Sequence, residues 1–201
     1  MAPVNSPMQY QLTNPYLLST QLDIDETVRL RMVEQILGQR DIADYHGGYT
    51  FEVLDSKVNR DFSTLYNKFL DLAREVFGPF TLSTKQKHWC WANVYNKDTF
   101  RTNMHTHELT STINGVFYLN IPQTDEPTGS GLMVGYDGAE HIFLPDNCDL
   151  VMMPSWMGHG PMPHNSNENR ISINMEICTT EDVHELYTLE KIYKNCSVKM
   201  E

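Results

Sequence analysis

The sequence is poor in cysteine, in basic residues and in long apolar runs, and each shortage narrows the class of protein. Its four cysteines are far apart and form no Cys-x-x-Cys pair, which favours reduced thiols over a disulfide framework. Only 15 lysines and arginines oppose 26 acidic residues, and this acidic balance argues against binding to nucleic acid or anionic lipid. The amino terminus lacks the pattern of a signal peptide, and no apolar run approaches the length of a membrane span. We therefore expect a cytoplasmic protein.

The length of 201 residues predicts a single domain built around one core. Within it, residues 1–80 form an amino-terminal arm and helices, residues 81–178 a β-rich core, and residues 179–201 a closing helix and tail. Residues 1–22 are polar and contain three prolines, which predicts an extended arm or edge strand. Such an arm could add a strand to a second copy of the chain and form a homodimer.

Helices are predicted where apolar residues recur at helical spacing, over residues 23–38 and 61–77. Residues 41–59, which contain a pair of glycines, predict a loop or short hairpin. A closing helix is expected over residues 180–194, with four apolar side chains facing the sheet: Val183, Leu186, Tyr187 and Ile192.

Short strands separated by clusters of turn residues are predicted through most of the second half of the chain. They cover residues 87–95, 102–108, 113–121, 132–134, 141–144, 150–153 and 170–178. Short strands at this spacing after a helical lead-in indicate a mainly β fold with flanking helices: a closed sandwich or a jelly roll (double-stranded β-helix) supported by the amino-terminal helices.

Three histidines and an arginine carry the strongest functional signal. His105 and His107 lie two apart in a predicted strand, so their side chains point to the same face. His159 follows about fifty residues later, and Arg170 lies one predicted strand beyond it, on the same face as Ser172. Imidazoles are common metal ligands, and the planar guanidinium can hold a carboxylate through two hydrogen bonds. This pattern indicates a metal that holds an anionic cosubstrate.

These residues also resemble a known superfamily. The run 105–120, together with 149–159 and 169–174, is similar to the histidine and arginine strands of 2-oxoglutarate/Fe(II) oxygenases of the prolyl-hydroxylase-like kind. The pattern also resembles that of oxygenases common in marine phages and bacteria. The order and spacing of these parts over residues 87–178 carry the resemblance, and the helical first third has no matching motif.

The resemblance implies an oxygenase whose cofactors are Fe(II) and 2-oxoglutarate, and which uses dioxygen to hydroxylate an unknown substrate. The metal ligands would be the three histidines named above. Arg170 would pair with the far carboxylate of the cosubstrate, with Ser172 beside it. Tyr118, and less directly Tyr95, would be the phenols near the cosubstrate.

The sequence departs from most of the superfamily at one ligand, because His107 stands where an aspartate is usual. Glu108 is the alternative carboxylate, but on a regular strand it points away from His105, and only a bulge would turn it inward. We favour His107 over Glu108. His164 lies near His159 in the sequence, but a Pro-His-Asn turn favours a loop residue over a ligand.

Two other functional classes compete with the oxygenase. A cupin-type three-histidine enzyme would need no 2-oxoglutarate, but Ser111 and Thr112 occupy the positions where cupins carry a glutamate. The missing aspartate also leaves open a binding or structural module that keeps the jelly roll without turnover.

Overall fold

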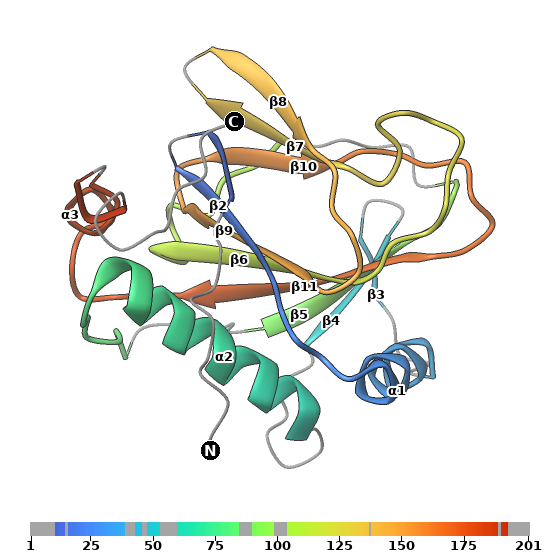
Figure 1. Cartoon of the computed structure of the whole chain (residues 1–201), viewed down its shortest axis with the longest axis horizontal. Coiled ribbons are helices and arrows are strands. Elements are labelled where there is room, and N and C mark those ends of the chain that lie inside the picture. Colours follow the sequence, from blue (N-terminus) through green and yellow to red (C-terminus); the bar gives the residue numbers. More distant parts are fainter. Residues whose placement is uncertain are drawn as a thin grey trace, which may run out of the picture.

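The computed structural model describes residues 11–14, 16–38, 43–45, 48–52, 60–84, 90–98, 104–136, 138–188 and 190–192. Parts of several predicted segments lie outside the described residues. They are the start of the arm over residues 1–22, much of the run 41–59, the start of the strand predicted from residue 87, the first part of the run 102–108, and the end of the closing helix with the tail. Figure 1 shows two antiparallel sheets facing each other, with helices outside the larger one. No helix among the described residues has the length and apolar character that a membrane crossing requires.

The larger sheet has eight strands in the order β1-β2-β9-β6-β11-β5-β4-β3, and the smaller has three in the order β10-β7-β8. Neighbouring strands are antiparallel throughout, and their non-consecutive order requires the chain to cross repeatedly between positions in the sheets. This confirms the predicted mainly β fold with flanking helices. The larger sheet consists of β1 (Gln11–Asn14), β2 (Leu17–Gln21), β3 (Ala43–Tyr45), β4 (Gly48–Glu52), β5 (Cys90–Tyr95), β6 (Ile113–Asn120), β9 (Asp149–Pro154) and β11 (Arg170–Ile177), and the smaller of β7 (Leu132–Tyr136), β8 (Ala139–Phe143) and β10 (Gly158–Pro161).

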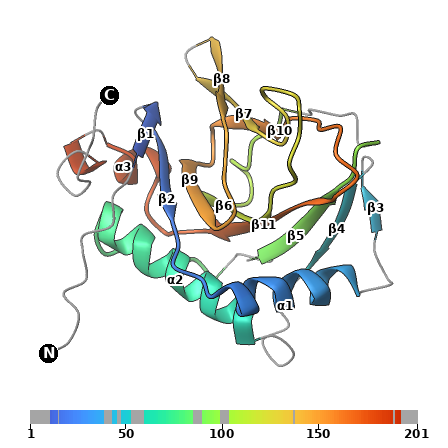
Figure 2. The ribbon, with the colours of Figure 1, turned by 45° about the vertical axis from the view of Figure 1, so that its right-hand side comes forward.

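Two helices cover the outer face of the larger sheet, as Figure 2 shows. They are α1 (Glu26–Leu37) and α2 (Arg60–Phe77), close to the predicted bounds. The Asp25 side chain accepts hydrogen bonds from the first turn of α1 and so caps it. Arg29 then ties α1 to the sheet, because its guanidinium donates to the Leu119 carbonyl oxygen at 2.8 Å.

The two faces of β11 have opposite chemical character. Its odd-numbered residues Ile171, Ile173, Met175 and Ile177 are all fully buried in the core between sheet and helices. Its even-numbered residues therefore point into the space between the two sheets. The predicted alternation along this strand is confirmed, and it directs a row of polar side chains inward: Arg170, Ser172, Asn174 and Glu176.

The predicted strand over residues 102–108 is wrong in its described part. Only His105 pairs there, through an isolated bridge to His159, and residues 108–110 form a turn. Strand β10, by contrast, was not predicted, because two glycines and a proline give its four residues little intrinsic preference for a strand. It forms because β7 offers a partner across the fold. The arm also adds β2 to the chain's own sheet, beside β9.

The predicted closing helix over residues 180–194 is interrupted. Only α3 (Val183–Leu186) forms before the chain turns at Tyr187. The Thr188 hydroxyl then accepts a hydrogen bond from the Lys191 backbone N–H, which is the capping contact that starts a new turn. The apolar side chains still face the core as expected, since Leu186, Tyr187 and Ile192 are buried and Val183 packs against the same cluster.

The missing side chain of Gly115 sets how closely α2 approaches the sheet. A Cβ atom added at this position in β6 would lie 2.6 Å from Cε2 of Phe69, which is fully buried in α2. No real Cβ tolerates such a contact without movement of its neighbour. The helix can therefore lie flat on the sheet only because this position has no side chain.

We predict that Gly115→Ala lowers the free energy of unfolding by about 1–3 kcal/mol, because the added methyl group overpacks the core against Phe69. Urea denaturation of the wild type and the variant measures the change. Gly135→Ala in β7 is the matched control, because only the flexible end of Met104 comes near, at 3.3 Å, and it should change stability by less than about 0.5 kcal/mol. Equal losses in both variants would contradict the role assigned to Gly115.

Candidate metal centre and anion pocket

The three histidines singled out in the sequence converge in the structure. One ligand nitrogen from each of His105, His107 and His159 lies within 4.8 Å of the others. The ring centroids are 4.6 Å apart for His105 and His159, 5.0 Å for His105 and His107, and 5.1 Å for His107 and His159. Within the described part of the chain this is the one group of histidine, cysteine and carboxylate side chains arranged to hold a metal ion.

Backbone hydrogen bonds bring these segments together even though the first histidine pair lies outside any regular strand. His105 and His159 exchange two N–H to carbonyl hydrogen bonds, each 3.0 Å long. The His107 backbone N–H donates to the Ser155 carbonyl oxygen at 2.8 Å. Residues 105–107 thus run antiparallel beside residues 155–159, and this pairing places all three side chains at one end of the space between the sheets.

The environment of His159 leaves one ring nitrogen ready to bind a metal. Its Nδ1 lies 3.0 Å from the Met157 carbonyl oxygen. A carbonyl oxygen can only accept, so Nδ1 carries the proton and Nε2 keeps its lone pair. Burial, assisted by the neighbouring His105, lowers the pKa of His159 to about 3, so the ring is neutral at physiological pH.

His107 has a partner that the sequence analysis missed. Its Nδ1 lies 2.6 Å from Oε1 of Glu176, and the Thr110 hydroxyl donates to the same oxygen at 2.9 Å. Glu176 is almost fully buried and lies at the end of the inward-facing row on β11. The alternation that placed Ser172 beside Arg170 extends to Glu176, so the signal was present, but the distant partner was not visible.

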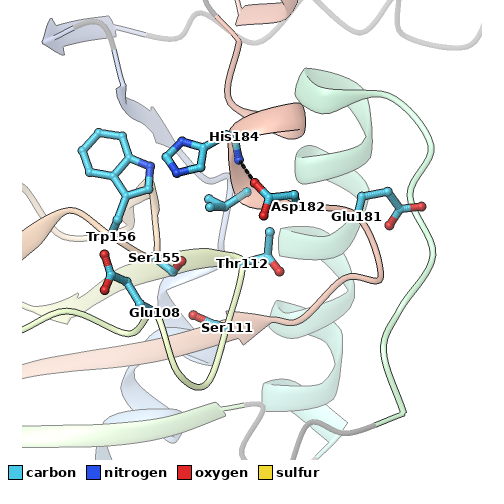
Figure 3. Close-up of a pocket in the computed structure, with 9 residues that line it drawn as sticks. Glu108, Ser111, Thr112, Ser155, Trp156, Glu181, Asp182 and His184 are labelled. Carbon is cyan, nitrogen blue, oxygen red and sulfur yellow. Dashed lines mark hydrogen bonds between the residues drawn. The ribbon is translucent and has the colours of Figure 1, made fainter.

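Glu108, the alternative carboxylate ligand, points elsewhere. It is exposed and lines a separate pocket of about 280 Å³ with Ser155, Trp156 and His184, as Figure 3 shows. His164 also lies outside the cluster of three histidines. It is buried, and its Nε2 lies 3.2 Å from the Tyr95 carbonyl oxygen. The structure therefore brings together the favoured ligand set and neither of the alternatives.

Arg170 lies in a buried polar pocket between the sheets. Only 1% of its surface is exposed, and its Nε donates to the Ser130 carbonyl oxygen at 3.1 Å. Its guanidinium carbon is 5.4 Å from the centre of the Tyr95 ring and 5.3 Å from that of Tyr118. The predicted phenols therefore flank the arginine, and Ser172 is buried two residues along the same face.

Two hydroxyl groups near this arginine are buried without a hydrogen-bond partner of standard geometry among the described residues. They belong to Tyr118 and Ser130. Burial raises the pKa of Tyr118 far above its usual range, an effect that the charge of Arg170 opposes, so the phenol keeps its proton and can donate it in a hydrogen bond. A buried cation beside unpaired donors is costly unless an anion completes the set.

Ser130 was not identified from the sequence, because it lies among the turn residues between two predicted strands. Its backbone has a φ of 62°, a left-handed conformation that is uncommon for residues other than glycine. The strained position is held by Arg170 on its carbonyl oxygen and by a 3.2 Å hydrogen bond from its N–H to the Pro163 carbonyl oxygen. Residues in such conformations gather at binding sites, where the surrounding structure holds them in place.

Comparison with known proteins finds a family model that matches the β-rich part of the chain. Residues 89–176 match a family model described as "Putative 2OG-Fe(II) oxygenase". No curated protein matches the chain. Solved structures do: a Pseudomonas putida prolyl-4-hydroxylase shares 16% identity over 82% of this chain and 93% of its own, with a TM-score of 0.61.

Two further structures extend the comparison beyond one kind of enzyme. A Trichoplax adhaerens prolyl hydroxylase, solved with a hypoxia inducible factor peptide fragment, shares 12% identity over 83% of this chain and 85% of its own, with a TM-score of 0.61. HygX from Streptomyces hygroscopicus, solved with nickel, 2-oxoglutarate and hygromycin B, shares 12% identity over 82% of this chain and 83% of its own, with a TM-score of 0.60.

The solved structures share the double-stranded β-helix expected from the strand pattern. The matched segment contains both histidine segments and the arginine strand of the site described above. Residues 89–176, which match the 2OG-Fe(II) oxygenase family model, therefore contain the whole histidine cluster and Arg170, and the solved structures show that the chain has the fold of 2-oxoglutarate/Fe(II)-dependent oxygenases.

Proposed function

We propose that this protein is an active oxygenase that couples the oxidative decarboxylation of 2-oxoglutarate to the hydroxylation of a carbon atom in a second substrate. The observation that carries the proposal is the convergence of three imidazoles on one point between the sheets, beside a buried arginine with no anionic partner among the described residues. A chelating 2-oxo acid requires both a metal for its 2-oxo acid end and a cation for its far carboxylate.

The donor set of the histidine cluster fits Fe(II). Imidazole nitrogens suit first-row transition metals of this kind, and the hydrogen bond at Nδ1 of His159 leaves its other nitrogen for the metal. We assign His105, His107 and His159 as the ligands. A bound iron would be chelated by the 2-oxo acid and would activate dioxygen. The protein's own residues bind and orient the reactants and exclude water.

The anion pocket fits the far carboxylate of 2-oxoglutarate. We assign Arg170 as its anchor, because the guanidinium fork can donate two parallel hydrogen bonds to a carboxylate. The Ser130 hydroxyl, which is buried without a partner among the described residues, and the buried phenol of Tyr118 beside Arg170 would complete the binding. Tyr95 and Ser172 form the adjoining wall of the pocket.

One feature favours a second candidate function, a binding module that keeps this fold without turnover. His107 occupies the position where most of the superfamily would supply a carboxylate ligand. Release of succinate from 2-oxoglutarate separates the two candidates, because only an oxygenase decarboxylates its cosubstrate. We expect iron-dependent succinate release that increases when pools of candidate peptides or small metabolites are added. A protein that binds Fe(II) and 2-oxoglutarate but releases no succinate with any pool would favour the module.

We predict that Arg170→Ala weakens 2-oxoglutarate binding by about 30-fold or more, because the carboxylate of the cosubstrate loses a buried, charged hydrogen-bond partner. The affinity for Fe(II) should stay within about 2-fold, since Arg170 is not a ligand. The weak visible absorption band of a 2-oxo acid chelated to Fe(II), recorded without oxygen, reports cosubstrate binding. Parallel loss of iron and cosubstrate would contradict the assigned role.

We predict that His107→Ala strongly reduces the amount of bound Fe(II). Glu108→Ala should leave the amount of iron per chain unchanged, because Glu108 is exposed and lies outside the histidine cluster. Iron per protein chain, measured after equilibration and desalting without oxygen, distinguishes the two variants. Loss of metal from the Glu108 variant alone would show that the ligand set is misassigned.

A further inference from the structure

We propose that Glu176 is a positioning residue for the metal centre, and that it returns to the site the negative charge that the replacement of aspartate by His107 removes. It would act through His107 and would not itself touch the metal. The inference rests on the proposed function of the histidine cluster, but it concerns a residue that lies outside the ligand set.

Glu176 is held in place from several directions. Its side chain is 4% exposed, and Oε1 lies 2.6 Å from Nδ1 of His107. The Thr110 hydroxyl donates to the same oxygen at 2.9 Å. On the opposite side of the sheet, the Tyr66 hydroxyl of α2 donates to the Glu176 backbone carbonyl oxygen at 2.7 Å. The central strand, a turn and a helix together therefore determine where this carboxylate lies.

The contact determines which nitrogen of His107 is available. A carboxylate accepts hydrogen bonds, so Nδ1 of His107 carries the proton and donates it to Glu176. The lone pair then lies on Nε2, the same nitrogen that the Met157 carbonyl oxygen leaves available on His159. A carboxylate that holds a metal-binding histidine in this way fixes its ring orientation and makes its other nitrogen a stronger donor.

The position of the charge is also informative. Three neutral imidazoles leave the full charge of a divalent ion on the site, whereas a histidine–aspartate pair would cancel part of it. Glu176 lies one imidazole ring away from the ion that His107 would hold. A buried carboxylate is costly without a positive group nearby, and a metal-bound imidazole that donates to it supplies one. In this chain the carboxylate therefore stands beside the residue proposed as a ligand, and is not itself that ligand.

A purely structural role is the competing explanation, because Glu176 also anchors the turn that follows His107. Two variants separate the roles. Glu176→Gln keeps the size of the side chain and an oxygen that can accept from Nδ1, but removes the charge. Thr110→Val removes the hydroxyl that ties the turn to Glu176 and leaves the contact between Glu176 and His107.

The experiment measures Fe(II) affinity without oxygen, by competition with a coloured chelator, and urea unfolding of each metal-free protein as a check on folding. We expect Glu176→Gln to weaken Fe(II) binding about 10-fold and Glu176→Ala about 100-fold, the range found for partners of metal ligands. Thr110→Val should stay within about 2-fold of the wild type.

A second arm uses His107→Asp, which restores a carboxylate ligand next to Glu176. In that background the two carboxylates repel each other, so Glu176→Gln should strengthen Fe(II) binding instead of weakening it. A structural role predicts the same loss in both backgrounds. A reversal of sign therefore supports the charge argument, and its absence overturns it.

The remaining outcomes are equally decisive. If the Glu176 variants bind Fe(II) within 2-fold of the wild type while His159→Ala loses it, the proposal for Glu176 fails and the metal centre stands. If Glu176→Gln abolishes binding as completely as His159→Ala does, Glu176 is itself a ligand and the positioning role is wrong. If His105→Ala and His159→Ala both keep wild-type affinity, the proposed function fails instead.

Discussion

Side-chain alternation along β11 is the constraint on which the rest of the structure depends. Its odd-numbered residues bury branched and apolar side chains under α1 and α2. Because side chains alternate along a strand, the even-numbered residues therefore face the smaller sheet. Arg170 stands at one end of that inner row and Glu176 at the other, about 20 Å apart along an extended strand. One strand thus carries the candidate anchor for an anion and the candidate support for a metal ligand, and a register slip of one residue would reverse both faces.

Burial gives these polar groups their chemical properties. The inner space is closed by a second apolar cluster that includes Val116, Val134 and Met153, so water has little access to the charges beside it. In such surroundings Arg170 interacts strongly with any anion it meets, Tyr118 keeps its proton, and His159 stays neutral. Desolvation also makes an unpaired donor costly, and we therefore interpret the Ser130 hydroxyl, which has no partner among the described residues, as part of a ligand site together with Tyr118.

The candidate site differs at one residue from the pattern usual in 2-oxoglutarate/Fe(II) oxygenases, and the surrounding structure accommodates the difference. A third imidazole at position 107 would supply no negative charge to a metal, but Glu176 on β11 is a buried carboxylate that accepts a hydrogen bond from Nδ1 of His107. The turn after His107 carries the Thr110 hydroxyl to the same oxygen. Ligand choice, turn geometry and the composition of the central strand are thus linked, which explains why position 107 cannot be interpreted apart from position 176.

The sequence by itself determined the two long helices, most of the central strands and the identity of the three histidines and Arg170, because local spacing encodes which face of an element is buried. Other features of the fold and the candidate site depend on contacts between distant segments. Strand β10 and the isolated bridge at His105 form through long-range backbone pairing that their own residues do not favour. Glu176 and Ser130 became recognisable only when distant segments met, since the partner of a buried polar atom is a property of the fold and not of its neighbours in the chain.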